Sequence, residues 1–407
     1  MPATYSARSA LVLLALALVA AGCGDDDGPA RTADGALAVY SSVPRQGVLA
    51  REGAAVAAGQ RLALEDAGQR AGGRRIRLVE LDSAEDADEP WDPAAIESNA
   101  NRAGDDPAAV AYLGELGLGG SAVSVPVTNA AGLAQVSPGD PLPSLTQPDP
   151  GGGGEIPARY YPDGERSFLR LVPHGGVEAK VLVDWAREQG AGTLAIVRDQ
   201  RVLGQELASW ALYEAQRAKL PVEVERARAG ADDYEDLAED VAERRPKVVI
   251  LTMPAGEDAD SVVAELRETL PAVPILATSA VAADPPPGVD FIDPHLPPQE
   301  YGPATARVLK RLGRSSGDPF AVAALYGYES MRLVLGAIGR ARPRGDADRA
   351  AVLRELLGVR RAEGIFGTYS LVPGGDVATA AFASYRASAG ARRPLRLRSA
   401  EGGPAAP

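Results

Sequence analysis

The chain has 407 residues, which is too long for one ordinary domain, so two domains are the first expectation. It is 45% hydrophobic, enough for substantial cores, and its formal net charge of −13 argues against nucleic acid as a partner. The single cysteine, Cys23, excludes an intrachain disulfide.

The N-terminus carries the features of an export signal. Arg8 precedes the apolar run Leu11–Ala21, and the small residues Ala20-Ala21-Gly22 come directly before Cys23. This is a charged n-region, a short h-region and a cleavage site, and the run is too short to span a bilayer comfortably. The pattern resembles a bacterial lipoprotein signal, in which the cysteine becomes the acylated first residue. Ala20, where Leu is commoner, is a departure.

These features predict a signal peptide at 1–22, lipid attachment at Cys23 and a polar tether at 23–35. The protein would then be anchored on the extracytoplasmic face of the bacterial cell membrane. A plain secretory signal with an incidental cysteine is the alternative.

The next part of the chain alternates short apolar strands with helices built from small residues. Strands are expected at Leu37–Tyr40, Ile76–Leu81, Val110–Leu113 and Leu133–Val136, and helices at Gly53–Ala67, Pro93–Arg102 and Ser121–Ala131. This βαβαβαβ order predicts a doubly wound parallel sheet.

The loops after the last two of these strands are the expected ligand-binding region. They are the glycine-rich turn Gly114–Gly120, with Ser121 directly after it, and the loop Ser137–Pro141. Loops of this kind meet at the carboxyl edge of a parallel sheet, where α/β proteins bind ligands. Residues Gly117–Ala122 also fit a loose dinucleotide fingerprint. They follow a late strand without an evident acidic ribose partner, so no cofactor is expected.

A second βα series follows the Pro- and Gly-rich surface insertion Pro148–Asp163. Strands are expected at Phe168–Val172, Thr193–Val197, Val222–Val224, Lys247–Thr252 and Pro274–Ala277, and helices at Gly176–Glu188, Glu206–Ala218, Asp232–Arg244 and Asp260–Thr269. Further helices are expected at Tyr301–Leu312, Pro319–Gly339 and Asp348–Leu357, then a closing hairpin of Gly367–Leu371 with Thr379–Tyr385 and a disordered tail at 389–407. The series predicts a second α/β domain.

Several local sequences occur in a recognisable order and spacing. They are the Asp92-Pro93 helix start, the Gly114 turn followed by Val136-Ser137-Pro138, Phe168-Leu169-Arg170, Leu203-Gly204, Ala324–Glu329, and Gly367-Thr368-Tyr369 with Gly375-Asp376. Together with the layout, they resemble the type I periplasmic solute-binding proteins. The resemblance is closest to the branched-chain amino-acid (leucine/isoleucine/valine) receptors of ABC importers.

The resemblance implies an α/β fold of two Rossmann-like lobes with parallel sheets, joined by a three-crossing hinge. The N-terminal lobe would comprise 36–170 and 290–360, and the C-terminal lobe 171–289 and 361–388. The hinge crossings would fall near Leu171–His174, Ala283–Pro294 and Arg361–Phe366. A small-molecule solute would lie in the cleft, and ABC permease subunits would be the partners.

The positions that bind an amino acid in this family are substituted. A hydroxyl after the glycine turn aligns with Leu118, a second hydroxyl with Pro141, a tyrosine with Leu203, and the acid that pairs with the ammonium with Ser279. Losing three or four charge-assisted hydrogen bonds would remove roughly 5–10 kcal/mol, against about 8 kcal/mol in a micromolar complex. Free zwitterionic amino acids should therefore bind poorly. Uncharged or monoanionic small molecules with an apolar body are the expected ligands.

The expected ligand-binding residues combine backbone amides at a helix start with apolar side chains. They are Leu118, Gly119, Gly120, Ser121, Gly139, Asp140, Leu203, Met253, Pro254 and Ser279. Asp140 is the only acid expected nearby, and Met253 could equally be a core residue. His174 and His295 are expected at hinge or surface positions, so no metal site is predicted.

Two functional classes remain, and without a nucleophile elbow neither is an enzyme. The first is a solute-binding lipoprotein that delivers a small molecule, amino-acid-like or less polar, to an ABC importer. The second is a lipoprotein of the same fold that has lost solute binding and acts through protein contacts. An enclosed cleft with backbone donors favours the first, and a filled cleft favours the second.

Overall fold

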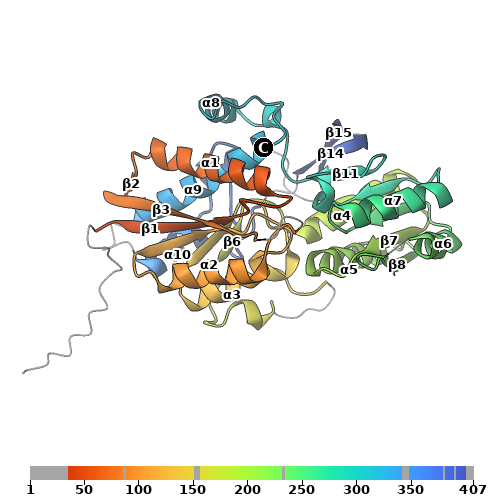
Figure 1. Ribbon diagram of the computed structural model, residues 1–407, viewed down its shortest axis with the longest axis horizontal. Coiled ribbons are helices and arrows are strands. Elements are labelled where there is room, and N and C mark those ends of the chain that lie inside the picture. Colours follow the sequence, from red (N-terminus) through yellow and green to blue (C-terminus); the bar gives the residue numbers. More distant parts are fainter. Residues whose placement is uncertain are drawn as a thin grey trace, which may run out of the picture.

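The computed structural model describes residues 35–85, 89–150, 156–231, 234–341, 348–378, 381–388 and 391–399. The expected signal peptide, Cys23 and nearly all of the expected tether lie outside these residues. The two α/β lobes lie side by side along the longest axis of the molecule (Figure 1). Within the described ranges, no helix has the length and apolar composition needed to cross a membrane.

The first lobe is built on a six-stranded sheet in the order β2-β3-β1-β4-β5-β6. Its strands are β1 (Leu37–Val43), β2 (Arg70–Ala71), β3 (Arg74–Asp82), β4 (Ala109–Leu113), β5 (Ala134–Ser137) and β6 (Phe168–Arg170). All pairs are parallel except β2 with β3. β1 and β4 are buried along their whole length, as expected for parallel strands covered on both faces.

Helices cover both faces of this sheet. They are α1 (Ala50–Asp66), α2 (Pro93–Asp105), α3 (Ser121–Ala130), α8 (Pro303–Arg311), α9 (Ala321–Ala341) and α10 (Arg349–Leu357). α1, α9 and α10 share one core with the sheet, and α2 packs on the opposite face. α2 begins where its sequence indicates, because the Asp92 carboxylate accepts from the Ala95 amide at 2.8 Å with Pro93 at the first helical position.

The second lobe is built on a seven-stranded sheet in the order β15-β14-β11-β10-β9-β7-β8. Its strands are β7 (Leu194–Arg198), β8 (Val222–Arg226), β9 (Val248–Leu251), β10 (Ile275–Ala277), β11 (Asp290–Asp293), β14 (Ala381–Ser388) and β15 (Ala391–Ser399). The helices are α4 (Gly175–Glu188), α5 (Val202–Arg217), α6 (Glu235–Glu243) and α7 (Glu257–Thr269). α4 and α5 cover one face, and α6 and α7 cover the other.

The structure moves one of the three expected hinge crossings and one lobe boundary. The first crossing lies between β6 and α4. The second follows Asp293, at the end of the expected range Ala283–Pro294. The lobe boundary expected at residue 290 lies four residues later, because residues 290–293 form β11 and pair with β10 and β14 in the second sheet. The third follows Ala378, because the segment expected to cross at Arg361–Phe366 packs against the first lobe through Ile365 and Phe366.

Two C-terminal expectations are wrong. β13 (Gly367–Tyr369) pairs with β12 (Ala362–Gly364) and not with the strand near Tyr385, which belongs to β14 and pairs with β11 and β15. The expected disordered tail includes β15, which adds to the sheet edge through an antiparallel ladder with one register shift, between Ser384 and Tyr385. Its Arg- and Pro-rich composition hides this strand, because an edge strand tolerates proline and charge.

A buried ion pair ties the first hinge crossing to the third. The guanidinium of Arg170, at the end of β6, is fully buried and donates from Nε to Asp376 Oδ1 at 2.7 Å. It also donates to the carbonyls of Asp140 and Leu142 at 3.0 and 2.8 Å. Burial alone would raise the pKa of Asp376, but the charge of Arg170 holds it below its usual range.

Candidate functional site

A cavity of about 290 Å³ lies between the two lobes, near the lower limit for small-molecule sites. It is walled by the start of α1, the loops after β4, β5, β10 and β11, the segment leading into α9 and the first residues of β15. Apolar side chains form much of the wall, including Leu49, Leu116, Leu118, Leu203 and Phe320. Both lobes therefore contribute to one cavity, which is partly open to solvent.

The cavity includes four of the ten residues expected from the sequence: Leu118, Gly139, Leu203 and Ser279. The other six do not line it: Gly119, Gly120, Ser121, Asp140, Met253 and Pro254. Met253 is 2% exposed and packs in the core of the second lobe.

The backbone amides expected to bind a ligand, at Gly119 and Ser121, already donate to Asp140. Its carboxylate is fully buried and accepts from the amides of Gly119 at 3.2 Å, Ser121 at 2.9 Å and Leu142 at 3.1 Å. A protein carboxylate thus occupies the start of α3, which was the expected position of a ligand carboxylate, where the helix dipole favours an anion.

The hydroxyl of Ser121 is also turned into the protein. It accepts from the amide of Glu115 at 3.2 Å, and both residues are buried. The Glu115 carboxyl accepts from the hydroxyls of Ser42 at 2.9 Å and Tyr112 at 2.8 Å. Burial raises the pKa of Glu115 to about 8, so this acid is largely uncharged at neutral pH. Neither group faces the cavity.

An apolar seam joins the lobes beside the cavity. Leu203 at the start of α5 is 4% exposed and belongs to a cluster with Leu142 of the first lobe and Ala280 of the second. Leu118 packs against the same cluster. Leu118 and Leu203, at the positions where the family resemblance implies a hydroxyl and a tyrosine, therefore fill part of the cleft with hydrocarbon.

The sequence reasoning missed the charged groups of the cavity: Glu52 on α1, Asp284 after β10, Asp293 and His295 at the end of β11, and Arg392 on β15. Asp293 Oδ1 accepts from the backbone amide of His295 and lies 2.8 Å from its ring Nδ1. Asp293 Oδ2 is 3.4 Å from Arg392 Nη1. The Asp-Pro-His triplet after a strand was the available signal, whereas Arg392 lay in the segment expected to be disordered.

The expectation that Asp140 is the only acid near the ligand is wrong. Glu52 is half-buried in the cavity wall, and burial raises its pKa. Glu178, in the first turn of α4, is buried and accepts from the amide of Ser279, the position aligned with the missing acid. Burial raises the pKa of Glu178 to about 7.

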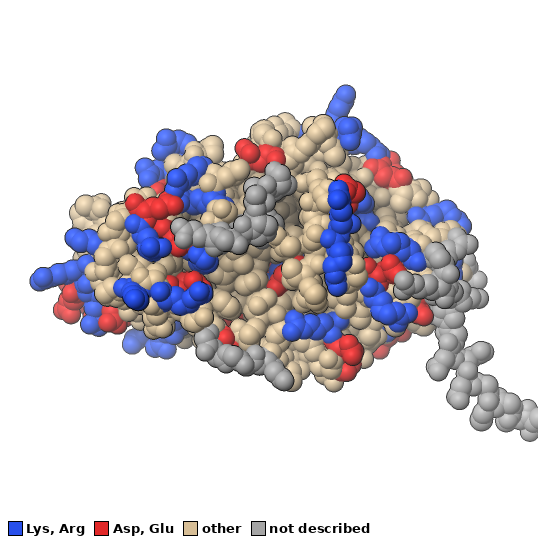
Figure 2. Space-filling model, turned by 180° about the vertical axis from the view of Figure 1, so that it is seen from behind, with Lys and Arg blue, Asp and Glu red and all other residues tan. Residues whose placement is uncertain are grey.

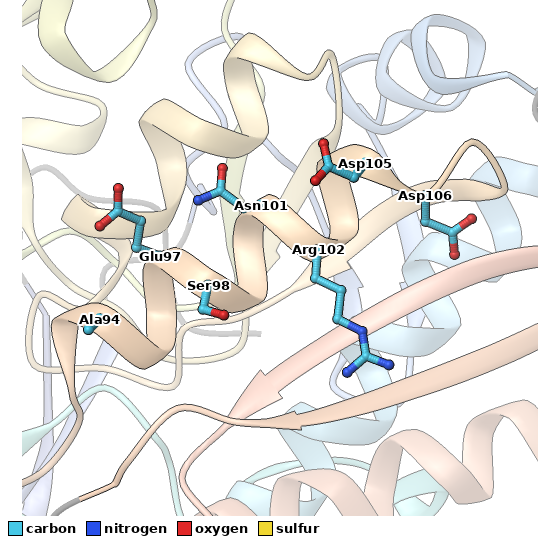
Figure 3. A pocket seen from close by; sticks show the side chains of 7 residues that line it. All are labelled: Ala94, Glu97, Ser98, Asn101, Arg102, Asp105 and Asp106. Atoms are coloured by element: carbon cyan, nitrogen blue, oxygen red, sulfur yellow. The ribbon is translucent and has the colours of Figure 1, made fainter.

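A depression of about 730 Å³ on the surface of the first lobe is not the candidate site. Its lining comes only from α2 and the residue after it, and the labelled side chains project along one flank of that helix (Figure 3). Basic and acidic side chains are interspersed over the face in Figure 2. Within the described residues, no group of three or more His, Cys, Asp or Glu side chains could hold a metal ion.

The sequence profile described as periplasmic binding protein matches residues 41–392. No curated protein matches the sequence. Several solved structures have a fold similar to that of this chain. Their sequence identities to it are low, so the similarity establishes the fold alone. A leucine-binding protein from Thermotoga maritima has a TM-score of 0.74 and 19% identity, covering 90% of this chain and 99% of the other.

Two further structures are ABC-transporter solute-binding proteins with other ligands. One from R. palustris, in complex with benzoate, has a TM-score of 0.69 and 18% identity, covering 90% of this chain and 97% of the other. One from Rhodopseudomonas palustris HaA2, in complex with p-hydroxybenzoic acid, has a TM-score of 0.70 and 15% identity, covering 91% and 98%.

Proposed function

Because the chain belongs to the periplasmic binding protein family, we propose that it is a lipid-anchored extracytoplasmic receptor that delivers a small solute to ABC permease subunits. The observation that carries the proposal is the cavity between the lobes, to which both sheets contribute loops. The hinge crossings would let the lobes close around a solute.

We assign the ligand contacts to Leu118, Gly139, Leu203 and Ser279 together with the charged groups of the cavity. The solute is uncharged or monoanionic and has an apolar body. Asp140 supports a ligand of this kind. Its carboxylate accepts from the amides at the start of α3, which are then not free to bind the carboxylate of an amino acid. The benzoate complex of a similar structure shows that this fold accommodates such a ligand elsewhere.

We expect leucine, isoleucine and valine to bind this protein more weakly than at micromolar affinity, and leucine to be undetectable in calorimetry at micromolar protein. The four substituted side-chain positions and the occupied amides leave the zwitterion without its usual partners, a loss of roughly 5 kcal/mol or more. Titration of the purified mature chain with each amino acid measures this. Tight binding of leucine would show that Glu52 or Asp293 replaces the missing ammonium partner.

The Asp140 carboxylate occupies the backbone amides at the start of α3, and this also favours the second candidate, a lipoprotein of this fold that binds no solute. A thermal-shift screen of small neutral and monoanionic compounds separates the two. A receptor gains stability with the logarithm of the ligand concentration once that concentration exceeds the Kd, by about 2.7 kcal/mol at a hundredfold excess. Failure of every compound to raise the melting temperature would favour the protein-contact role.

Replacing Cys23 with Ala is expected to release the protein from the membrane fraction. The thiol is the proposed acylation point, and without a lipid the chain has no proposed anchor. Immunoblotting of membrane and soluble fractions after a high-salt wash measures the change, with the wild type as control. Retention of the Cys23→Ala protein in washed membranes would refute the lipid anchor.

A further inference from the structure

The imidazole of His295 is fixed in one orientation at the wall of the cavity. Asp293 Oδ1 lies 2.8 Å from its Nδ1, and the ring of Tyr326 meets it edge-on with centroids 4.5 Å apart. The other nitrogen, Nε2, faces the first lobe, since a Cβ atom added to Gly139 would lie 3.7 Å from it. Within the described part of the chain, Nε2 has no hydrogen-bond partner.

The charges around this imidazole favour its protonated form. Burial alone lowers the pKa of His295, but the charge and hydrogen bond of Asp293 and the charge of Glu52 raise it above its usual value overall. Arg392 contributes a second cation 3.4 Å from Asp293, so the triad of Asp293, protonated His295 and Arg392 carries one net positive charge.

The acids that face the triad do not neutralise it completely. The carboxylate of Glu178 is used by the amide of Ser279, and Asp284 is exposed at the rim. Glu52 lines the cavity, and burial raises its pKa, so it is charged over a narrower pH range than an exposed acid is. An uncharged carboxyl is itself a hydrogen-bond donor.

We propose that this triad is the anion anchor of the cleft, with His295 Nε2 donating to the carboxylate of a monoanionic solute and Arg392 as the second cation. The inference rests on the proposed receptor function and names the polar end of its solute. Asp293 is a positioning residue, because it holds the imidazole and leaves Nε2 as the free donor. The leucines on the first-lobe side would contact the apolar body, in a space of about 290 Å³.

Benzoate and benzamide test the anchor, because they have nearly the same shape and differ in charge. The wild type should bind benzoate at least about tenfold more tightly than benzamide at a pH of about 6. That preference should shrink as the pH rises through the raised pKa of His295, since deprotonation removes the positive charge. Benzamide binding should stay constant.

The His295→Gln variant keeps a neutral donor and removes the charge. Its affinity for benzoate should fall by about 10- to 100-fold, while its affinity for benzamide changes by no more than a few fold. His174→Gln is the matched control. His174 caps α4 by accepting from the Gly176 amide at 3.1 Å and does not line the cavity. Burial lowers the pKa of His174 to about 4, so it does not titrate in this range.

Arg392→Gln provides an independent test if His295→Gln does not fold. Removing the second cation of the anchor should weaken benzoate binding at a pH of about 6 and leave benzamide binding unchanged. Equal affinity of the wild type for the two probes would overturn the anchor and leave the receptor function standing. Absence of binding of both would overturn the anchor and also the assignment of the cavity to a ring-sized solute.

Discussion

Replacing Arg170 with Met is expected to lower the free energy of unfolding by about 3–5 kcal/mol. The substitution keeps much of the hydrocarbon volume but leaves the buried Asp376 carboxylate without its cation. It also removes the donor of the Asp140 and Leu142 carbonyls and a contact with the hydroxyl of Thr146. Urea denaturation followed by circular dichroism measures the loss.

Two further variants make the Arg170 test specific. Arg77→Met removes a half-exposed partner of Asp106 on the surface and should cost no more than about 1 kcal/mol. Adding Asp376→Asn to Arg170→Met should restore part of the stability, because no unpaired charge then remains buried. An Arg170→Met loss as small as that of Arg77→Met would show that the hinge pair does not stabilise the fold.

Replacing Gly327 with Ala is expected to destabilise the protein by about 3 kcal/mol or more, at the upper end for overpacking. Gly327 lies on α9 where it crosses α1, and an added Cβ would lie 2.7 Å from the carbonyl carbon of Val56 and overlap its oxygen. On α1, a Cβ added to Gly59 would lie 2.6 Å from the amide nitrogen of Tyr328. Both obstacles are backbone, so the helices must separate to accept the methyl group.

Gly336→Ala is the matched control on the same helix. Its Cβ would meet only the end of the flexible Arg340 side chain, at 3.2 Å. Both substitutions gain helix propensity, worth up to about 1 kcal/mol, so Gly336→Ala should be neutral or stabilising. Thermal unfolding of the wild type and both variants should therefore show a lowered melting temperature for Gly327→Ala and an unchanged or raised one for Gly336→Ala. A Gly327→Ala melting temperature equal to that of the wild type would contradict the close crossing.

The pattern of apolar residues and helix caps in short segments was sufficient to predict the helices and strands of the first lobe. The continuous apolar run at Val110–Leu113 predicted a buried strand, and the structure forms β4 there. The Asp92-Pro93 pair predicted the start of α2, whose capping bond is present. These are effects of neighbouring residues, so they can be identified without tertiary contacts. Alternating strands and helices then predicted the two α/β lobes, because a parallel connection requires a crossover.

The site was predicted less well because its geometry depends on long-range partners. Leu118 and Leu203 line the cavity between the lobes, and their contact with a ligand stays a prediction. The role of Asp140 could not be read from the sequence, since a carboxylate beside a helix start can bind a ligand or cap the helix itself. Only the fold showed that its oxygens accept from Gly119 and Ser121.

The sequence by itself determined the order of the elements, because strand and helix periodicity and helix caps are properties of short segments. Only the tertiary structure decided which sheet each C-terminal strand joins, and hence which charges enter the cleft. β15 offers only Leu395 and Leu397 in alternation with arginines, and both leucines are exposed. The strand is held by backbone pairing with β14, which any residue except proline can make. That pairing brings Arg392 to within 3.4 Å of Asp293, from which it is separated by 99 positions in the chain.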